Sequence, residues 1–260
     1  MSRAGFDVAL IGDDEDDVRS MCLSVLGSGG RALGLAIDGT QHSPFVAALG
    51  EIRERLGPID VWISLDACGR DHRPMRGPAS PPRQVSVAEP FAWGLGDAFD
   101  DMLRHDGGTL VVVESSSAFV VDGRRRNDCA MAFARRGYVE GIRQLALSRD
   151  SAVRVSSLYT TFPEPNSSDV ERVTAHGRQI GRAVVTAARN GRRQSVVGLR
   201  TWLSITTARL FPGTYDHHAA HIVVGDEAST TLDWSGAAGA CRSRWREIVM
   251  AAGGTNGVQP

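Results

Sequence analysis

Short apolar runs alternate with longer amphipathic segments along most of the chain. The apolar runs predict buried β-strands at 7–12, 31–38, 59–65, 109–115, 153–161 and 194–198. The segments between and after them predict helices at 13–30, 43–57, 87–105, 127–148, 168–191 and 201–211. This alternation is typical of a mostly parallel sheet with helices on both faces, so we predict a doubly wound α/β domain.

The end of the chain departs from this alternation. Residues 1–215 are predicted to form the α/β domain, and residues 216–260 to form a C-terminal tail that is not an independent domain. The stretch "GACRSRWREIVMAA" (239–252) predicts one amphipathic helix within the tail. Residues 66–84 are rich in Pro, Gly and Arg, which predicts a long loop that is either functional or disordered.

The composition of the chain argues against several kinds of binding partner. The chain has 260 residues, of which 42% are hydrophobic, and a net charge of -1, so nothing global indicates nucleic acid or an anionic membrane as a partner. No apolar run approaches the roughly 20 residues that span a bilayer, and no signal-peptide core precedes the first strand. We expect a soluble, cytoplasmic protein that acts on a small molecule.

Two features limit the chemistry. The four cysteines lie far apart with no CxxC pair, so we expect no metal site. All 29 basic residues are arginine, which excludes a Schiff base or a lysine general base.

Several stretches resemble the short-chain dehydrogenase/reductase family in unbroken order. They are "GGRALGLAIDGT…FVAALGEIRERLGPIDVWI", "HDGGTLVVVESSS", "GYVEGIRQLAL" and "GRAVVTAARNGRRQSVVGLRTWLSITTARLFPG". The resemblance covers about residues 7–213 and rests on order and spacing, because no single motif is intact. It implies a Rossmann-like fold.

The resemblance also shows where the family's dinucleotide motif, T-G-x-x-x-G-x-G, has changed. If "DVALIG" is the family's first strand, the motif reads "GDDEDDV" and keeps only Gly12. In a second register, residues 8–38 resemble the family's second strand, third helix and third strand, and the glycine-rich βα unit is missing. The second register fits better. Because both registers remove the phosphate cradle, we expect an altered or missing N-terminal βα unit and no cofactor.

The family's catalytic positions are replaced as well. The resemblance places the catalytic tyrosine on Ala132, the lysine on Arg136, and the Pro-Gly after the sixth strand on Thr160-Thr161. The family's serine falls among residues 115–117. Since Ala132 cannot supply a proton, we interpret the chain as a degenerate member that lacks the Tyr/Lys pair.

Polar residues remain at the carboxyl ends of the predicted strands, where open α/β sheets bind ligands. The candidate catalytic residues are Glu114, Ser115, Ser117, Arg136, Asp66 and Tyr159. The candidate substrate-binding residues are Ser64, Trp93, Tyr138, Thr160 and Thr161. A carboxylate could act as general base while Arg136 stabilises an enolate or oxyanion. This set predicts a cofactor-independent, redox-neutral biosynthetic enzyme that catalyses a cyclisation, aldol-type closure, dehydration or isomerisation.

Two other functions stay open. The protein could be a non-catalytic partner or ligand-sensing protein on the same scaffold, or an atypical NAD(P)H-dependent reductase. In the family, the helices that correspond to 87–105 and 127–148 form dimer interfaces. The resemblance therefore implies a homo-oligomer formed through these two helices.

Overall fold

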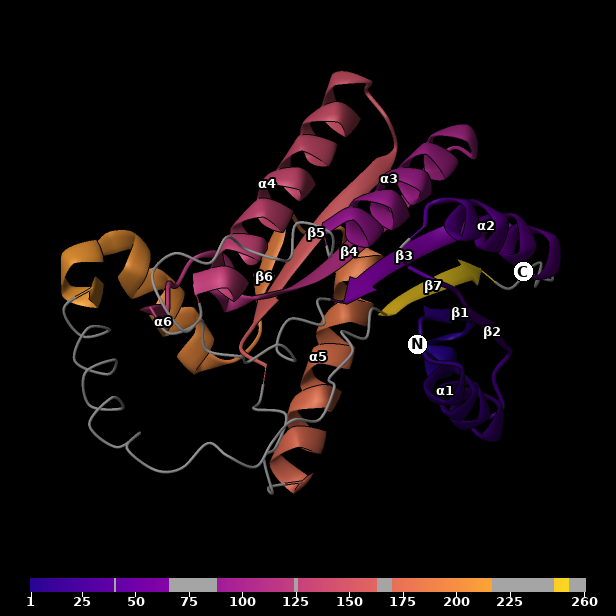
Figure 1. Cartoon of the computed structure of the whole chain (residues 1–260), viewed down its shortest axis with the longest axis horizontal. Coiled ribbons are helices and arrows are strands. Elements are labelled where there is room, and N and C mark those ends of the chain that lie inside the picture. The colour runs from indigo at the N-terminus through magenta and orange to yellow at the C-terminus, as the bar shows by residue number, and fades with distance from the viewer. Residues whose placement is uncertain (40, 66–87, 124–125, 163–169, 217–245, 253–260) are drawn as a thin grey trace, which may run out of the picture.

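The computed structural model describes residues 1–39, 41–65, 88–123, 126–162, 170–216 and 246–252 (Figure 1). The strands are β1 (Phe6–Gly12), β2 (Ala32–Ala36), β3 (Ile59–Leu65), β4 (Gly108–Ser115), β5 (Val153–Thr160), β6 (Gln194–Val196) and β7 (Arg246–Ala252). The helices are α1 (Glu15–Gly27), α2 (Ser43–Leu56), α3 (Ala88–Arg104), α4 (Arg126–Ser148), α5 (Val170–Asn190) and α6 (Leu199–Leu210), with short 3-10 turns η1 (Ser2–Ala4) and η3 (Ser116–Ala118). The predicted Rossmann-like α/β fold is confirmed.

The strands form one seven-stranded sheet in the order β2-β1-β7-β3-β4-β5-β6. A Rossmann sheet has the order 3-2-1-4-5-6. In this chain β2 and β1 take the places of the third and second Rossmann strands, and β3, β4 and β5 take those of the fourth to sixth. The place of the first strand is filled by β7. This order agrees with the second of the two sequence registers.

β7 connects the two parts of the sheet. It pairs along its whole length with β1, from Gly12↔Arg246 to Phe6↔Ala252, and with β3 on its other side. Both pairings are antiparallel, whereas the other neighbouring strands are parallel, and Figure 1 shows the β7 arrow pointing against that of β3. Within the described residues, β1 and β3 are therefore connected in the sheet only by their hydrogen-bonded pairing with β7.

The prediction of a helix at 239–252 is wrong where the structure can test it, because residues 246–252 form β7. Ile248, Val249 and Met250 lie between two strands, and a buried strand can carry a continuous apolar run. Periodicity alone does not separate such a strand from a short helix. The sheet thus extends into the segment that was predicted to be a tail.

Helices cover both faces of the sheet. On one face α2, α3 and α4 bury a cluster that contains Phe45, Trp62 and Leu95. On the other face α1 and α5 bury a second cluster around Val111 and Leu158. Figure 1 shows α3 and α4 side by side along their length, so the two helices form one layer on this face. The homo-oligomer predicted through these two helices stays a prediction.

Candidate active site at the carboxyl ends of β4 and β5

Glu114 and Tyr159 lie side by side at the carboxyl ends of β4 and β5. They are register partners on the two parallel strands, and each side chain is only 1% exposed. Burial raises the pKa of Glu114 to about 7, although Tyr159 and the positive charges of Arg136 and Arg143 lower it. Burial, followed by the nearby Glu114 carboxyl, raises the pKa of Tyr159. Glu114 is therefore poised to exchange a proton near neutral pH, while Tyr159 keeps its own.

Neither group has a hydrogen bond of normal geometry to another described residue. Both carboxyl oxygens of Glu114 and the hydroxyl of Tyr159 are buried without such a partner. The two groups are nevertheless close enough for each to shift the pKa of the other. Unsatisfied buried polar groups cost free energy, and perturbed carboxyls of this kind concentrate at functional sites.

A cluster of hydroxyl groups follows this pair directly along the chain, where β4 and β5 end. The Ser115 hydroxyl donates to Ser117 Oγ at 2.9 Å, and the Ser117 amide donates back to Ser115 Oγ at 3.2 Å. Thr161 Oγ1 lies 3.1 Å from Ser116 Oγ and 3.0 Å from Thr201 Oγ1. The cluster joins the end of β4, the end of β5 and the first turn of α6.

Thr160, by contrast, points to α5. Its side chain is fully buried, and its Oγ1 lies 3.1 Å from Nε2 of His176. Thr160 and Thr161 therefore contact different elements, although both had been predicted to bind substrate.

Arg136 extends from α4 over this site. Its Nη1 donates to the Ala118 carbonyl at 3.1 Å, and its guanidinium carbon lies 3.9 Å from the centroid of the Phe119 ring. Ala132, one turn earlier on α4, is buried in a small cluster that includes Tyr159 and Ile205. The helix thus packs closely at the position where the resemblance would place a tyrosine.

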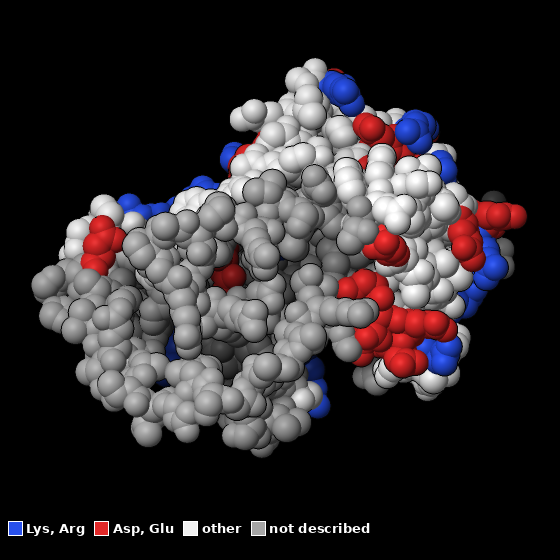
Figure 2. Space-filling view, viewed as in Figure 1, with Lys and Arg blue, Asp and Glu red and all other residues white. Residues whose placement is uncertain are grey.

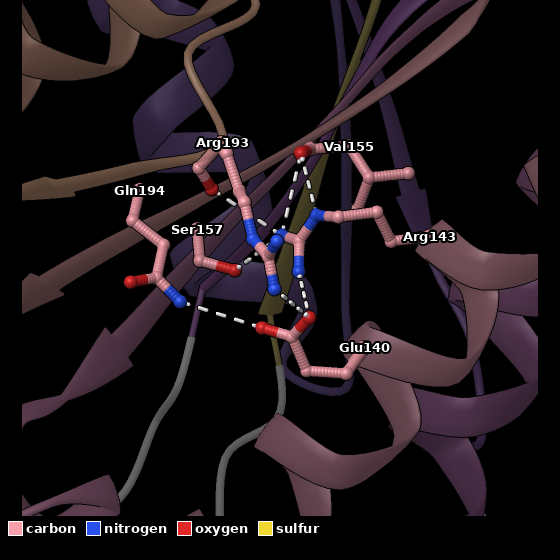
Figure 3. A network of polar contacts seen from close by, with 6 residues as sticks. All are labelled: Glu140, Arg143, Val155, Ser157, Arg193 and Gln194. Carbon is pink, nitrogen blue, oxygen red and sulfur yellow. Dashed lines mark hydrogen bonds and ion pairs between the residues drawn. The ribbon is translucent and has the colours of Figure 1, made fainter. Parts of the chain in front are cut away.

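A polar network joins α4 to β5 and to the segment around Arg193 and Gln194 (Figure 3). Arg143 is buried, and its Nη1 lies 2.6 Å from Oε2 of Glu140. Its other nitrogens donate to Ser157 Oγ at 3.1 Å and to the carbonyls of Val155 and Arg193 at 3.3 Å. Burial raises the pKa of Glu140, but Arg143 and Arg193 outweigh that effect and hold this pKa below its ordinary value. The network therefore supplies a fixed charge pair that acts electrostatically on the Glu114 carboxyl.

Four predicted site residues lie elsewhere or cannot be placed. Trp93 packs against His42 and Phe45, with ring centroids 5.5 and 6.4 Å apart, between α2 and α3. The Tyr138 hydroxyl donates to the Ala92 carbonyl at 3.0 Å, which directs this side chain to α3.

Ser64 is buried near the end of β3, where it pairs with Val112 of β4. Asp66 lies outside the described residues. The site therefore gathers Glu114, Ser115, Ser117, Arg136, Tyr159 and Thr161, but not Trp93 or Tyr138.

Sequence reasoning missed the contributions of α5 and α6. Thr201 and Arg209 reach the site from α6, and Arg209 lies 4.4 Å from the Phe119 centroid. From α5, His176 contacts Thr160 beside the site. Thr201, Ile205 and Arg209 are spaced four residues apart, which places them on one face of a helix. This spacing was the sequence feature that could have indicated their common position.

The fold implies a nicotinamide dinucleotide, and the described residues do not fit its pyrophosphate. In Rossmann proteins the pyrophosphate lies at the helix N-terminus that follows the central strand. Here the central place is taken by β7, which runs antiparallel to both neighbours, so among the described residues no helix follows it at the carboxyl ends of β1 and β3. The other turn that could serve, after β1, leads into α1, whose N-cap is Asp14 and whose first turn contains Glu15, Asp16 and Asp17. Figure 2 shows acidic side chains gathered over the part of the molecule where Figure 1 draws α1. These carboxylates would repel a pyrophosphate.

Other site types have little support in the described part of the chain. It contains no group of three or more His, Cys, Asp or Glu side chains placed to hold a metal ion. None of its helices has the length and apolar character that crossing a bilayer requires.

Comparisons with known proteins connect this geometry to a fold family. No family model matches the sequence, and no curated protein matches it. Among solved structures, a short-chain dehydrogenase/reductase from Burkholderia phymatum in complex with NAD is 15% identical, with a TM-score of 0.62 over 77% of this chain and 83% of that chain. A hydroxysteroid dehydrogenase from Escherichia coli is 15% identical, with a TM-score of 0.59 over 75% and 86% of the two chains.

A 3-ketoacyl-ACP reductase from Sinorhizobium meliloti is 19% identical, with a TM-score of 0.51 over 66% of this chain and 68% of that chain. These similar structures correct the expectation of a redox-neutral, cofactor-independent cyclase, isomerase or lyase, because their names describe dehydrogenases and reductases. At these identities the comparison establishes architecture. The chain has the α/β Rossmann-like fold of the short-chain dehydrogenases/reductases.

Proposed function

We propose that the protein is an enzyme, an atypical oxidoreductase that interconverts a carbonyl and a hydroxyl group of a small molecule. The observation that carries this proposal is the buried Glu114–Tyr159 pair at the carboxyl ends of β4 and β5, beside a cluster of hydroxyl groups. This is the edge at which open α/β sheets bind ligands. The similar structures that are dehydrogenases and reductases support the reaction class.

Glu114 holds the proton that the reaction moves. A carbonyl that is reduced must gain a proton on its oxygen, and an acid with a pKa near the working pH both donates and regains a proton efficiently. With its pKa raised to about 7, Glu114 meets this requirement. Tyr159 faces it and remains protonated at neutral pH, so its hydroxyl can relay a hydrogen bond to the reacting oxygen.

The hydroxyl cluster and Arg136 position the substrate. Ser115, Ser117 and Thr161 are less buried than Glu114, so they are the groups that a ligand meets first. Hydroxyl donors at this place can bind a carbonyl oxygen, and the fixed charge of Arg136 stabilises negative charge that develops on it.

A nicotinamide, when bound, supplies the hydride in this reaction class. The described residues offer no cradle for its pyrophosphate, so we assign that group to no residue of the chain. The assignment of Glu114, Tyr159 and the hydroxyl cluster concerns only the proton and the substrate.

Deuteride transfer tests the proposal directly. The full chain is incubated with NADH or NADPH carrying deuterium at C4 and with separate aliphatic, aromatic and acidic ketones, and deuterium in the product alcohol is measured by mass spectrometry. We expect transfer to at least one class. Glu114→Gln should lower the rate by roughly 100-fold or more, because it removes the proton-holding group. Glu54→Gln, which changes an exposed carboxylate on α2, should leave the rate unchanged.

Two results would overturn the proposal. One is the absence of deuterium transfer to every ketone class with either dinucleotide. The other is a rate in Glu114→Gln equal to that of the wild type. The absence of transfer together with retained ligand binding would favour the ligand-sensing function instead.

A further inference from the structure

Two guanidinium groups lie over the ring of Phe119. The guanidinium carbon of Arg136, from α4, is 3.9 Å from the ring centroid, and that of Arg209, from α6, is 4.4 Å from it. Because both distances are measured from one ring centroid, the two guanidinium groups are no farther apart than these distances combined. Helices that are distant in the sequence thus place two cations at one spot beside the active site.

Neither cation is neutralised by a described residue. Arg136 and Arg209 make no ion pair with any carboxylate in the described ranges, and Arg136 donates instead to a backbone carbonyl. Glu114 attracts Arg136 electrostatically, but with a pKa of about 7 it is only partly ionised at neutral pH. The face of an aromatic ring stabilises a nearby cation only modestly. The spot therefore carries an excess of positive charge.

We propose that Arg136 and Arg209 bind an acidic group of the substrate, a carboxylate or a phosphoryl group. This inference rests on the proposed function, because it assumes that the bound anion is part of the enzyme's substrate. The planar fork of a guanidinium matches the oxygens of either acidic group, and an anion beside the Phe119 ring that contacts both arginines offsets their mutual repulsion. The substrate class is a small hydroxy or carbonyl compound that carries an acidic group.

The arrangement places this anion beside the reacting atoms. The Phe119 ring contacts Tyr159 edge to face, with centroids 4.6 Å apart, and Tyr159 is the register partner of Glu114. Thr201, on the Arg209 face of α6, contacts Thr161 of the hydroxyl cluster. One helical face therefore contacts both the hydroxyl cluster and the anion position, which fits a single bound molecule.

Thermal unfolding of the full chain tests anion binding without any turnover. The midpoint is measured in sodium chloride, sodium phosphate and sodium malonate at equal ionic strength, for the wild type and for Arg136→Gln, Arg209→Gln and Arg200→Gln. Arg200 is an exposed residue of the same helix α6 and serves as the matched control. General effects of these salts on stability shift all four proteins alike.

We expect phosphate, malonate or both to raise the midpoint of the wild type and of Arg200→Gln by roughly 2–4 °C relative to chloride. This shift should disappear in Arg136→Gln and Arg209→Gln. The anion that gives the larger shift indicates which acidic group the site prefers. A shift in Arg209→Gln equal to that of the wild type, or no anion-specific shift in the wild type, would overturn the proposal.

A second readout separates an anion site from a purely structural contact. In low-salt chloride, Arg209→Gln should unfold at the same temperature as Arg200→Gln or above it, because one of two repelling charges is gone. A contact that serves only packing predicts a clearly lower midpoint. If the anions raise the midpoint but no deuteride is transferred, the anion site is supported and the oxidoreductase proposal fails. If deuteride is transferred but the anions do not raise the midpoint, only the anion-site proposal fails.

Discussion

Glu114 and Tyr159 are direct register partners on β4 and β5, and both side chains are almost completely buried at the end of the sheet where ligands bind. A buried carboxyl beside a buried phenol is costly to the fold. This cost gives the pair a measurable effect on stability as well as its proposed part in proton transfer.

The first prediction concerns pH and stability. The folded-state pKa of Glu114, about 7, lies above its ordinary value of 4.5, so the folded state binds the extra proton between these two values. The contribution of Glu114 to stability is therefore fully present below pH 4.5 and is lost as the pH rises through about 7. The loss amounts to about 3 kcal/mol.

The variant Glu114→Gln carries no titrating group at this position. Its free energy of unfolding should therefore increase relative to that of the wild type between pH 5 and pH 8. Denaturant unfolding at several pH values measures the difference. Parallel pH profiles of the two proteins would show that Glu114 does not titrate in this way.

The second prediction concerns β7. Because β1 and β3 are joined only through this strand among the described residues, removing residues 246–260 should leave the sheet in two parts. We expect loss of a single cooperative unfolding transition in calorimetry and exposure of apolar surface that binds a hydrophobic dye. Removing only residues 253–260 keeps β7 and is the control. An unchanged transition in the longer deletion would contradict the central position of β7.

The third prediction compares two glycines. A Cβ on Gly34 of β2 would lie 2.7 Å from Cys22 Sγ and 2.9 Å from Val18 Cγ1 of α1, so Gly34→Ala should destabilise the protein by about 1–3 kcal/mol. On α2 a Cβ at Gly50 meets nothing within 4 Å, so Gly50→Ala should stabilise the protein by about 0.5–1 kcal/mol. Denaturant midpoints give both values. A neutral Gly34→Ala would mean that α1 does not approach β2 this closely.

The fourth prediction concerns the network that holds α4. Replacing Arg143 by Met leaves Glu140, the Ser157 hydroxyl and two carbonyls with fewer partners, so we expect a loss of about 3 kcal/mol in the free energy of unfolding. Arg178→Met, at an exposed position on α5, should change stability by less than about 0.5 kcal/mol. Equal effects of the two substitutions would show that the network does not hold the helix.

The sequence pattern predicted the elements of the sheet well but missed how the sheet is completed. Strands and helices up to residue 211 follow from hydrophobic periodicity, because each buries one face or both. The apolar run Ile248–Met250 is equally compatible with a helix and with a strand. Its pairing with β1 on one side and β3 on the other determines that it forms a strand. Such long-range pairing leaves no local signal in the sequence.

The positions of candidate-site residues could be predicted from the sequence where those residues lie at the ends of strands. Glu114 and Tyr159 stand at fixed positions at the ends of two strands, so the sheet topology alone brings them together. Trp93 lies apart from the other candidate residues because a helix can turn a side chain either toward the sheet end or toward a neighbouring helix, and here it packs on α2. Arg209 was missed because its partner, Phe119, is ninety residues away in the sequence.

Calorimetric titration of the full chain with NADH and with NADPH tests the proposed oxidoreductase function most directly. The proposal predicts saturable binding of at least one dinucleotide at micromolar concentration, as is typical of enzyme–substrate affinities. No heat and no thermal shift at millimolar NADH or NADPH would contradict it, and the function of this fold in this chain would then lie outside hydride transfer.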